Sequence, residues 1–191
     1  MGALGLLALA ACGSSEGETP SAQTDAAGIP IVRIEARYAT ALAADLETLV
    51  SSMDAAFVGE VIGQRPQREE PAVGRGATLP ISVFEVRVAH SAGGPATGST
   101  VLVEQVGGIT TADGETVRVL LEGDTPIVPG ARYLFIADRT ESGAYSVTSF
   151  ARFRIEHGVV RAPDGWEALG ASVELAGTRQ GSAMARVSDA R

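Results

Sequence analysis

The sequence predicts a mainly β protein whose folded part is a single small antiparallel barrel or sandwich. Three observations favour this fold class. Several short segments alternate apolar and polar residues with a period of two. Glycine- and proline-rich turns separate them at regular intervals. The chain shows no β-α-β alternation, which a parallel sheet would require.

The amino terminus resembles an export signal. Residues 4–11 are an apolar run of about the length found in signal peptides, and the run is too short to span a bilayer. It ends in Leu9, Ala10, Ala11 and Cys12. A Leu at the third position before Cys, followed by two small residues, resembles the lipobox of bacterial lipoproteins. The resemblance implies cleavage before Cys12, a diacylglycerol on its thiol, and a lipid-anchored protein on the extracytoplasmic face of the cell membrane.

The segment after Cys12 is expected to be a flexible tether. Residues 13–30 are small, polar and acidic, and they could not fill a core. We therefore divide the chain into a signal peptide (1–11), a tether (12–30), a β-barrel domain (31–160) and a C-terminal extension (161–191).

One short amphipathic helix is predicted before the first strand, over residues 38–50. Its apolar residues recur at intervals of three or four: Tyr38, Leu42, Leu46 and Leu49. Strands are then expected at residues 55–63, 81–89, 100–106, 117–121, 132–138, within 143–155, and at 159–160.

Details of the strand pattern give further expectations. The first strand is apolar on both faces, and Gly59 and Gly63 mark bends or close backbone approaches. Pro129-Gly130 predicts a type II turn, and His157-Gly158 predicts a tight turn. The pattern fades after residue 160, and the tail beyond about residue 177 is expected to be poorly ordered.

The order of these features resembles the netrin-like or tissue-inhibitor-like OB barrel, in a cysteine-free form. The resemblance covers residues 36–160 and is carried by MDAAFVGEVIG, ISVFEVRVAHSAGG, GSTVLVEQVGG and the stretch from IVPGARYLF to EHGVV. It implies an OB-like barrel that binds on one sheet face and its flanking loops. Inhibition of metalloproteases through a free amino-terminal Cys is not implied here, because Cys12 would be acylated and lies far upstream of the barrel.

Composition narrows the choice of partners. The formal net charge is −8, so the acidic surface would repel phosphate backbones and nucleic acid is excluded as a partner. A hydrophobic fraction of 45% is enough for a real core. All basic residues are Arg, and both Lys and Asn are absent. This bias is typical of a GC-rich genome, so clusters of Arg carry less functional information than usual.

The sequence offers little for metal or cofactor binding. His90 is placed at a strand end and His157 in a turn, and the single Cys is assigned to the lipid. Four carboxylates flank the predicted strand 117–121, and we interpret them as surface groups rather than as a calcium site: Asp113, Glu115, Glu122 and Asp124. We therefore expect neither a metal nor a cofactor.

Catalytic motifs are also lacking. The chain has no GxSxG sequence, and its Ser residues fall in predicted linkers and loops. Glu69-Glu70 is interpreted as solvated charge, and residues 74–79 as a flexible loop rather than a phosphate loop. Tyr145 and Phe150 are assigned to the core, with a binding platform as the alternative.

The sequence thus favours a non-enzymatic binding or interaction module whose partner, a protein or a glycan, it does not identify. The candidate binding loops are residues 64–78 and 107–116. Two alternatives remain open: an enzyme that uses paired carboxylates, which need no sequence signature, and a structural lipoprotein of an envelope complex.

Replacing Cys12 with Ser tests the anchor. The variant should leave the membrane fraction and keep its signal uncleaved, because the acyl acceptor is missing. Membrane fractionation and intact-protein mass spectrometry measure both effects. A wild-type protein with unmodified Cys12 still joined to Ala11 would contradict the anchor.

Overall fold

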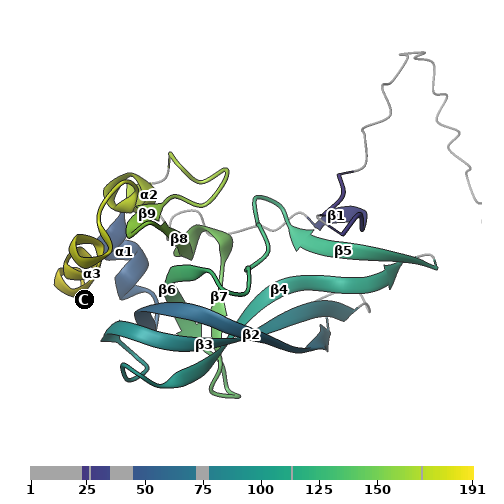
Figure 1. Cartoon of the computed structure of the whole chain (residues 1–191), viewed down its shortest axis with the longest axis horizontal. Helices are drawn as coiled ribbons and strands as arrows, with labels where there is room; N and C mark the ends of the chain where they lie inside the picture. The colour runs from purple at the N-terminus through teal and green to yellow at the C-terminus, as the bar shows by residue number, and fades with distance from the viewer. Residues whose placement is uncertain (1–22, 26, 35–44, 72–77, 113, 169) are drawn as a thin grey trace, which may run out of the picture.

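The computed structural model describes residues 23–25, 27–34, 45–71, 78–112, 114–168 and 170–191. The chain is mainly β, as predicted (Figure 1). The strands are β1 (Ile31–Ile34), β2 (Ala55–Pro71), β3 (Thr78–Gly93), β4 (Thr100–Ala112), β5 (Glu115–Leu121), β6 (Arg132–Arg139), β7 (Tyr145–Val147), β8 (Arg152–Glu156) and β9 (Val159–Arg161). The helices are α1 (Leu46–Ser51), α2 (Gly170–Leu175) and α3 (Gln180–Asp189), with a 3-10 turn η2 (Ser149–Ala151).

The strands form one nine-stranded sheet in the order β1-β5-β4-β3-β2-β6-β8-β9, and β7 pairs with both β4 and β6. Because β7 bridges β4 and β6, the pairs close a ring: β2–β3, β3–β4, β4–β7, β7–β6 and β6–β2. Within the ring only β4–β7 is parallel. Strands β5 and β1 extend one side, and β8 and β9 extend another, so the sheet is not the simple barrel that the sequence predicts.

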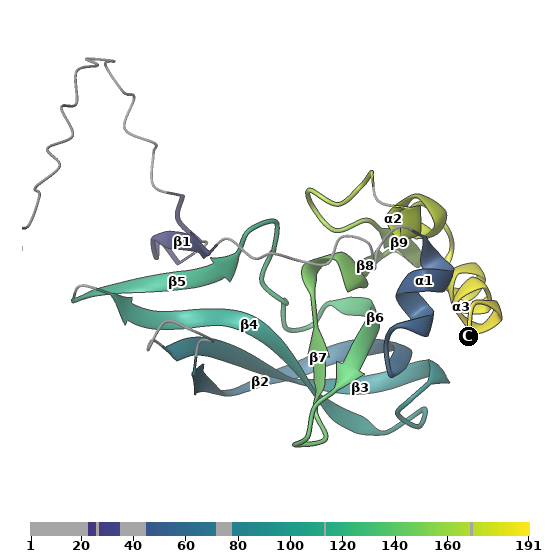
Figure 2. The same cartoon turned by 180° about the vertical axis from the view of Figure 1, so that it is seen from behind.

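Strands β2 and β6 separate two hydrophobic cores. Phe57 and Phe135 belong to the core enclosed by the ring, whereas Val58 and Leu134 belong to a second core that includes residues of all three α-helices. Both faces are therefore buried over residues 55–61, which confirms the prediction for that part of the strand, whereas Ile62 is exposed. Figures 1 and 2 show the helices gathered at one end of the molecule and the β4–β5 hairpin at the other.

Two of the predicted turns and one close approach are confirmed. A Cβ on Gly59 would lie 2.2 Å from Cγ1 of Val86, so only glycine fits where β2 crosses β3. The turn at Gly130 has a φ of 81°, and Ala131 N–H donates to Val128 O at 3.1 Å. His157 adopts a φ of 52° in the turn between β8 and β9.

The assignment of residues 64–78 and 107–116 as loops is wrong, because the described residues of these segments are mostly strand. Strand β2 runs on to Pro71 and β3 starts at Thr78, while β4 runs to Ala112 and β5 starts at Glu115. Residues 72–77 and 113 lie outside the described part of the chain. Residues 64–71 are polar, so their sequence shows no strand pattern. This part of the hairpin is largely exposed and needs no apolar face.

Side chains connect the β2–β3 hairpin to the β4–β5 hairpin in the region where the backbones of β3 and β4 no longer pair. The β3–β4 pairing ends at Ile81, next to Pro80, which has no N–H to donate. The side-chain amide of Gln67 then bonds both backbone groups of Ile109, donating to its O at 2.7 Å and accepting from its N–H at 2.8 Å. The Gln67 amide thus takes the place of a strand partner. Arg68 donates nearby to the buried carboxylate of Glu104, at 3.1 and 2.6 Å.

The end of the predicted tether is docked rather than free. Strand β1 pairs in parallel with β5 and covers the edge of that strand. Asp25 forms an ion pair with Arg118 at 2.7 Å and also accepts from the N–H groups of Ala27 and Ile29. These bonds hold the turn that leads into β1. Residues 12–22 of the tether lie outside the described residues.

The predicted helix is partly seen. Helix α1 begins after Asp45, which accepts from Thr48 N–H at 2.6 Å and is a favourable N-cap. That bond holds the pKa of Asp45 below its ordinary value. Leu46 and Leu49 face the core, as their spacing predicts. Residues 38–44 of the predicted helix fall outside the described residues.

The expectation of a poorly ordered tail is wrong. Helices α2 and α3 fold back onto the core, where Leu175, Ala183 and Val187 are buried. The last residue, Arg191, donates to the backbone oxygens of Met53 and Asp54 at 3.2 and 2.8 Å. The apolar positions of α3 are few, so sequence periodicity did not reveal a helix that tertiary packing stabilises.

The docking of β1 should depend on the charge of Asp25. The N–H of Ile29 and the Arg118 guanidinium hold the pKa of Asp25 below its ordinary 3.8. A lowered pKa gives stabilisation that is complete above 3.8 and is lost as the pH falls through the lower, folded-state value. Backbone NMR signals of residues 31–34 should therefore stay constant down to about pH 4 and shift below it.

Asp25→Asn should displace the same NMR signals already at neutral pH, because the ion pair to Arg118 is gone. Glu115→Gln, an exposed carboxylate on β5, is the matched control and should behave as the wild type. Native signals of β1 in the Asp25→Asn protein at pH 7 would show that the ion pair does not hold this strand.

Candidate functional site

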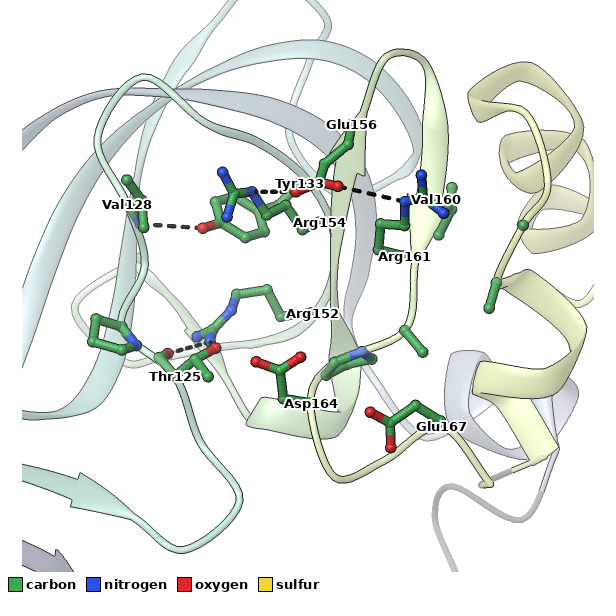
Figure 3. Close-up of a pocket in the computed structure, with 15 residues that line it drawn as sticks. Thr125, Val128, Tyr133, Arg152, Arg154, Glu156, Val160, Arg161, Asp164 and Glu167 are labelled. Atoms are coloured by element: carbon green, nitrogen blue, oxygen red, sulfur yellow. Dashed lines mark hydrogen bonds and ion pairs between the residues drawn. The ribbon is translucent and has the colours of Figure 1, made fainter. Parts of the chain in front are cut away.

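A cavity of about 580 Å³ opens between the loop 122–131, strands β6, β8 and β9, and the segment 162–168 (Figure 3). Its charged and aromatic lining comes from Tyr133, Arg152, Arg154, Glu156, Arg161, Asp164 and Glu167. Its apolar lining includes Pro126, Val128, Val160, Ala162, Pro163 and Ala176. Its volume lies in the range of about 300–1,000 Å³ that is typical of small-molecule sites.

A buried ion pair forms one wall of the cavity. Arg152 of β8 is 3% exposed and Asp124 of the loop 122–131 is 2% exposed. The Nη2 atom of Arg152 donates to Asp124 Oδ1 at 2.9 Å and to the backbone oxygen of Thr125. The centre of the guanidinium lies 5.8 Å from the ring centre of Tyr133, which is a cation–π distance. Arg152 therefore has little freedom to move.

Gln105 of β4 completes this polar network. Its Nε2 donates to Asp124 Oδ2 at 2.9 Å and to Thr125 O at 2.7 Å, and its Oε1 accepts from Ile127 N–H at 3.0 Å. Both carboxylate oxygens of Asp124 are thus used. Because the charges are buried, the network needs these bonds to offset the loss of hydration.

One donor of the network has no partner. Nη1 of Arg152 is buried and makes no hydrogen bond to any described residue. An unsatisfied buried donor costs roughly 1–3 kcal/mol, and more when the group is charged. Such groups are uncommon in native proteins, and a bound water or ion is one kind of partner that can satisfy them.

Charges around the cavity mouth are incompletely paired. Glu156 lies between two arginines, 3.4 Å from Nε of Arg154 and 3.5 Å from Nε of Arg161. Among the described residues, neither Asp164 nor Glu167 forms an ion pair. Figure 3 shows Asp164 and Glu167 on the segment 162–168, apart from the group of Arg154, Glu156 and Arg161.

Trp166 fastens the segment that carries these acids. Its indole Nε1 donates to Gly123 O at 2.9 Å, and its ring lies 5.5 Å from that of Phe150. The loop 122–131 and the segment 162–168 face each other across the cavity, and Trp166 connects them. Trp166 therefore links the two walls of the cavity.

A second, more apolar cavity of about 390 Å³ lies on the other side of the loop 122–131. Phe84, Leu120 and Ile127 line it, and Gln105 is also part of its wall. The loop residues Pro126 and Val128 line both cavities. The Gln105–Asp124–Arg152 network thus passes between the two.

The predicted lipidation site is outside this description. Cys12 and the lipobox residues Leu9, Ala10 and Ala11 lie outside the described residues, so the anchor stays a prediction. In the part of the chain that the structure covers, no helix has both the length and the apolar character needed to cross a bilayer.

The histidines lie apart from the cavity lining. His90 is exposed within β3 rather than at its end, and His157 occupies the turn after β8. Among the described residues no group of three or more His, Cys, Asp or Glu could hold a metal ion. Tyr145 and Phe150 are buried in the core, so neither forms a surface platform.

The predicted carboxylate positions are partly corrected. Glu115 and Glu122 are exposed, as expected, but Asp124 is buried and paired, so its assignment to the surface was wrong. Asp113 lies outside the described residues. Glu69 and Glu70 are exposed, and Glu70 pairs with Arg68. Hydrogen bonds to Glu104 and Glu70 raise the pKa of Arg68.

Partial loss of hydration and the neighbouring Asp54 carboxylate raise the pKa of Asp138, which lies near the end of β6.

The sequence analysis missed Arg152, Asp124 and Gln105 as a unit. Arg152 and Arg154 alternate with Phe153 and Ile155 in the RFRI stretch, and this pattern predicts two solvent-facing arginines. Only the tertiary arrangement shows that the loop 122–131 covers the first of them. Gln105, a buried polar residue two positions after the core residue Val103, was a local signal.

No known family model matches the chain, and a comparison with curated proteins finds no match. The chemistry of the cavity must therefore be argued from its own residues. Three arginines, three carboxylates and an apolar surface suit binding by charge and hydrogen bonds.

Arg152→Leu should lower the free energy of unfolding by about 3–5 kcal/mol, because Asp124 would stay buried without its partner. Adding Asp124→Leu should restore most of the loss, since no unpaired charge then remains. Arg154→Leu, whose arginine is half exposed, should cost about 0–1 kcal/mol. Urea unfolding measures all three. A loss in Arg152→Leu no larger than in Arg154→Leu would contradict the role given to the buried pair.

Proposed function

We propose that this protein is a lipid-anchored, extracytoplasmic and non-enzymatic binding module that captures a small ligand in the cavity beside Arg152. The observation that carries the proposal is the buried guanidinium with an unsatisfied Nη1 in the wall of a ligand-sized cavity. A ligand acceptor that reached this donor would satisfy it, and the network already holds the guanidinium in place.

The strand pairing supports an OB-like, netrin-like interpretation of the domain. In the ring, β7 lies between β4 and β6, so the spatial order departs from the sequence order as in a five-stranded Greek-key barrel. Helix α1 precedes β2, the first strand of the ring. The additional strands β1, β5, β8 and β9 are extensions of that plan. The binding site we propose lies beside the ring. It is formed where β8 pairs with β6 and the loop 122–131 covers Arg152 of β8.

The lipobox supports the proposed location. A single lipid-modified Cys12, followed by the tether, would hold the acidic domain near a membrane surface without inserting it. The pairing of β1 with β5, together with the turn at Asp25, holds the described end of the tether against the domain.

A second function, catalysis by carboxylates, has one observation in its favour. Glu156, Asp164 and Glu167 all line the same cavity. Paired carboxylates can act as acid and base when their environments move their pKa values apart. In a binding module they would instead orient the ligand.

Thermal unfolding of the purified protein against a panel of glycans, short peptides, small anions, metals and envelope proteins tests the proposal. One class should raise the Tm progressively with the logarithm of its concentration, and a ligand at a hundred times its Kd stabilises by about 2.7 kcal/mol. Arg161→Gln should reduce the shift, because Arg161 lines the cavity. Arg87→Gln, on the surface of β3 and paired with Glu60, is the control.

The two functions give different results in that experiment. A ligand that stabilises the protein and is recovered unchanged supports a binding module. A ligand that is chemically converted supports the carboxylate enzyme. A shift that Arg161→Gln leaves intact would place the binding site elsewhere and overturn the proposal.

A further inference from the structure

We propose that the ligand of the Arg152 cavity is a small zwitterion, with a carboxylate and an ammonium group, of the class of short unblocked peptides. This inference rests on the proposed function and names the chemistry of its ligand. It is carried by the separation of charge around the cavity together with the unsatisfied donor in its wall.

The carboxylate of the ligand belongs on the arginine side. Arg152 keeps Nη2 for Asp124 and Thr125, so Nη1 is the donor left to satisfy. Two further arginines, Arg154 and Arg161, share one acid at long distances of 3.4 and 3.5 Å, which leaves an excess positive charge. A guanidinium binds a carboxylate more strongly than it binds a neutral acceptor.

The ammonium group belongs beside Asp164 and Glu167, which Figure 3 shows apart from Arg154 and Arg161. Asp164 and Glu167 lie on the segment 162–168 and, among the described ion pairs, neither has a basic partner. The one bond given for these side chains is from Gly165 N–H to Glu167 at 3.1 Å. A ligand with negative charge alone would be repelled by these two acids, and a cation alone by the arginines. A zwitterion satisfies both sides at once.

The apolar lining of the cavity suits a short peptide chain. Val128, Val160 and Pro163 are among the apolar residues that line the cavity, and the cavity mouth is open to solvent. Small apolar side chains of a peptide would contact this surface without needing a pocket of specific shape. The probe we choose is therefore trialanine, which carries both terminal charges and small side chains.

Isothermal titration of the purified full-length protein with four forms of trialanine tests each charge separately. The forms are the free peptide, the N-acetylated peptide, the C-terminal amide and the doubly blocked peptide. The free peptide should bind most tightly, and each block should weaken binding about tenfold, which is about 1.4 kcal/mol. A doubly blocked peptide that binds as well as the free one would overturn the inference.

Substitutions assign each charge to its side of the cavity. Arg161→Gln should weaken the free and the N-acetylated peptide but leave the C-terminal amide unchanged. Asp164→Asn should weaken the free peptide and the amide but leave the N-acetylated form unchanged. Arg87→Gln and Glu60→Gln remove the same charges from a surface pair on β3 and β2, and should leave all four affinities unchanged. Equal losses for all peptides in both cavity variants would contradict the assignment.

Failure of this inference can be distinguished from failure of the proposed function. If trialanine does not bind at millimolar concentration, while another member of the ligand panel stabilises the protein and depends on Arg161, the cavity is a binding site and its ligand is not a zwitterion. If neither trialanine nor any panel member responds to the cavity substitutions, both proposals are wrong.

Discussion

The ion pair between Asp124 and Arg152 joins parts of the chain that no backbone pairing connects. Arg152 belongs to β8, Asp124 to the loop after β5, and their partner Gln105 to β4. A long loop that runs over a sheet would normally be mobile, since it lacks regular backbone bonds. Here three buried side chains hold it. Two cavities then exist, because the same loop stands as a wall between them.

Burial is what gives this pair its influence. An exposed pair of charges contributes little, because water screens it and both side chains lose conformational freedom. At 3% and 2% exposure neither charge can recover hydration without opening the fold. The position of the loop is therefore strongly specified even where the net stabilisation is small. The specified loop therefore fixes the shape of the cavity wall that Arg152 lines.

The sequence predicted most of the strands, and it missed parts that are exposed or that depend on distant partners. Strands β2 and β6 were recognisable because burial on both faces leaves near-continuous apolar runs, and Gly59, Gly130 and His157 stand where backbone geometry needs them. The exposed half of the β2–β3 hairpin gave no such signal, because two solvent-facing sides carry no alternation. Helix α3 and strand β1 depend on distant partners, so local pattern could not predict them. The same holds for the site, whose residues come from β8, β9 and two loops.

The bond from Trp166 to Gly123 has an optical consequence. Trp166 is the only tryptophan of the chain, and its indole donates to the residue just before Asp124. Its ring also packs on Phe150 of η2, so one chromophore senses both the loop 122–131 and the segment that carries Asp164 and Glu167. Indole emission shifts in wavelength with the polarity around the ring. Any movement of the two cavity walls relative to each other would therefore be recorded by intrinsic fluorescence, without a label and without a second tryptophan to confuse the signal.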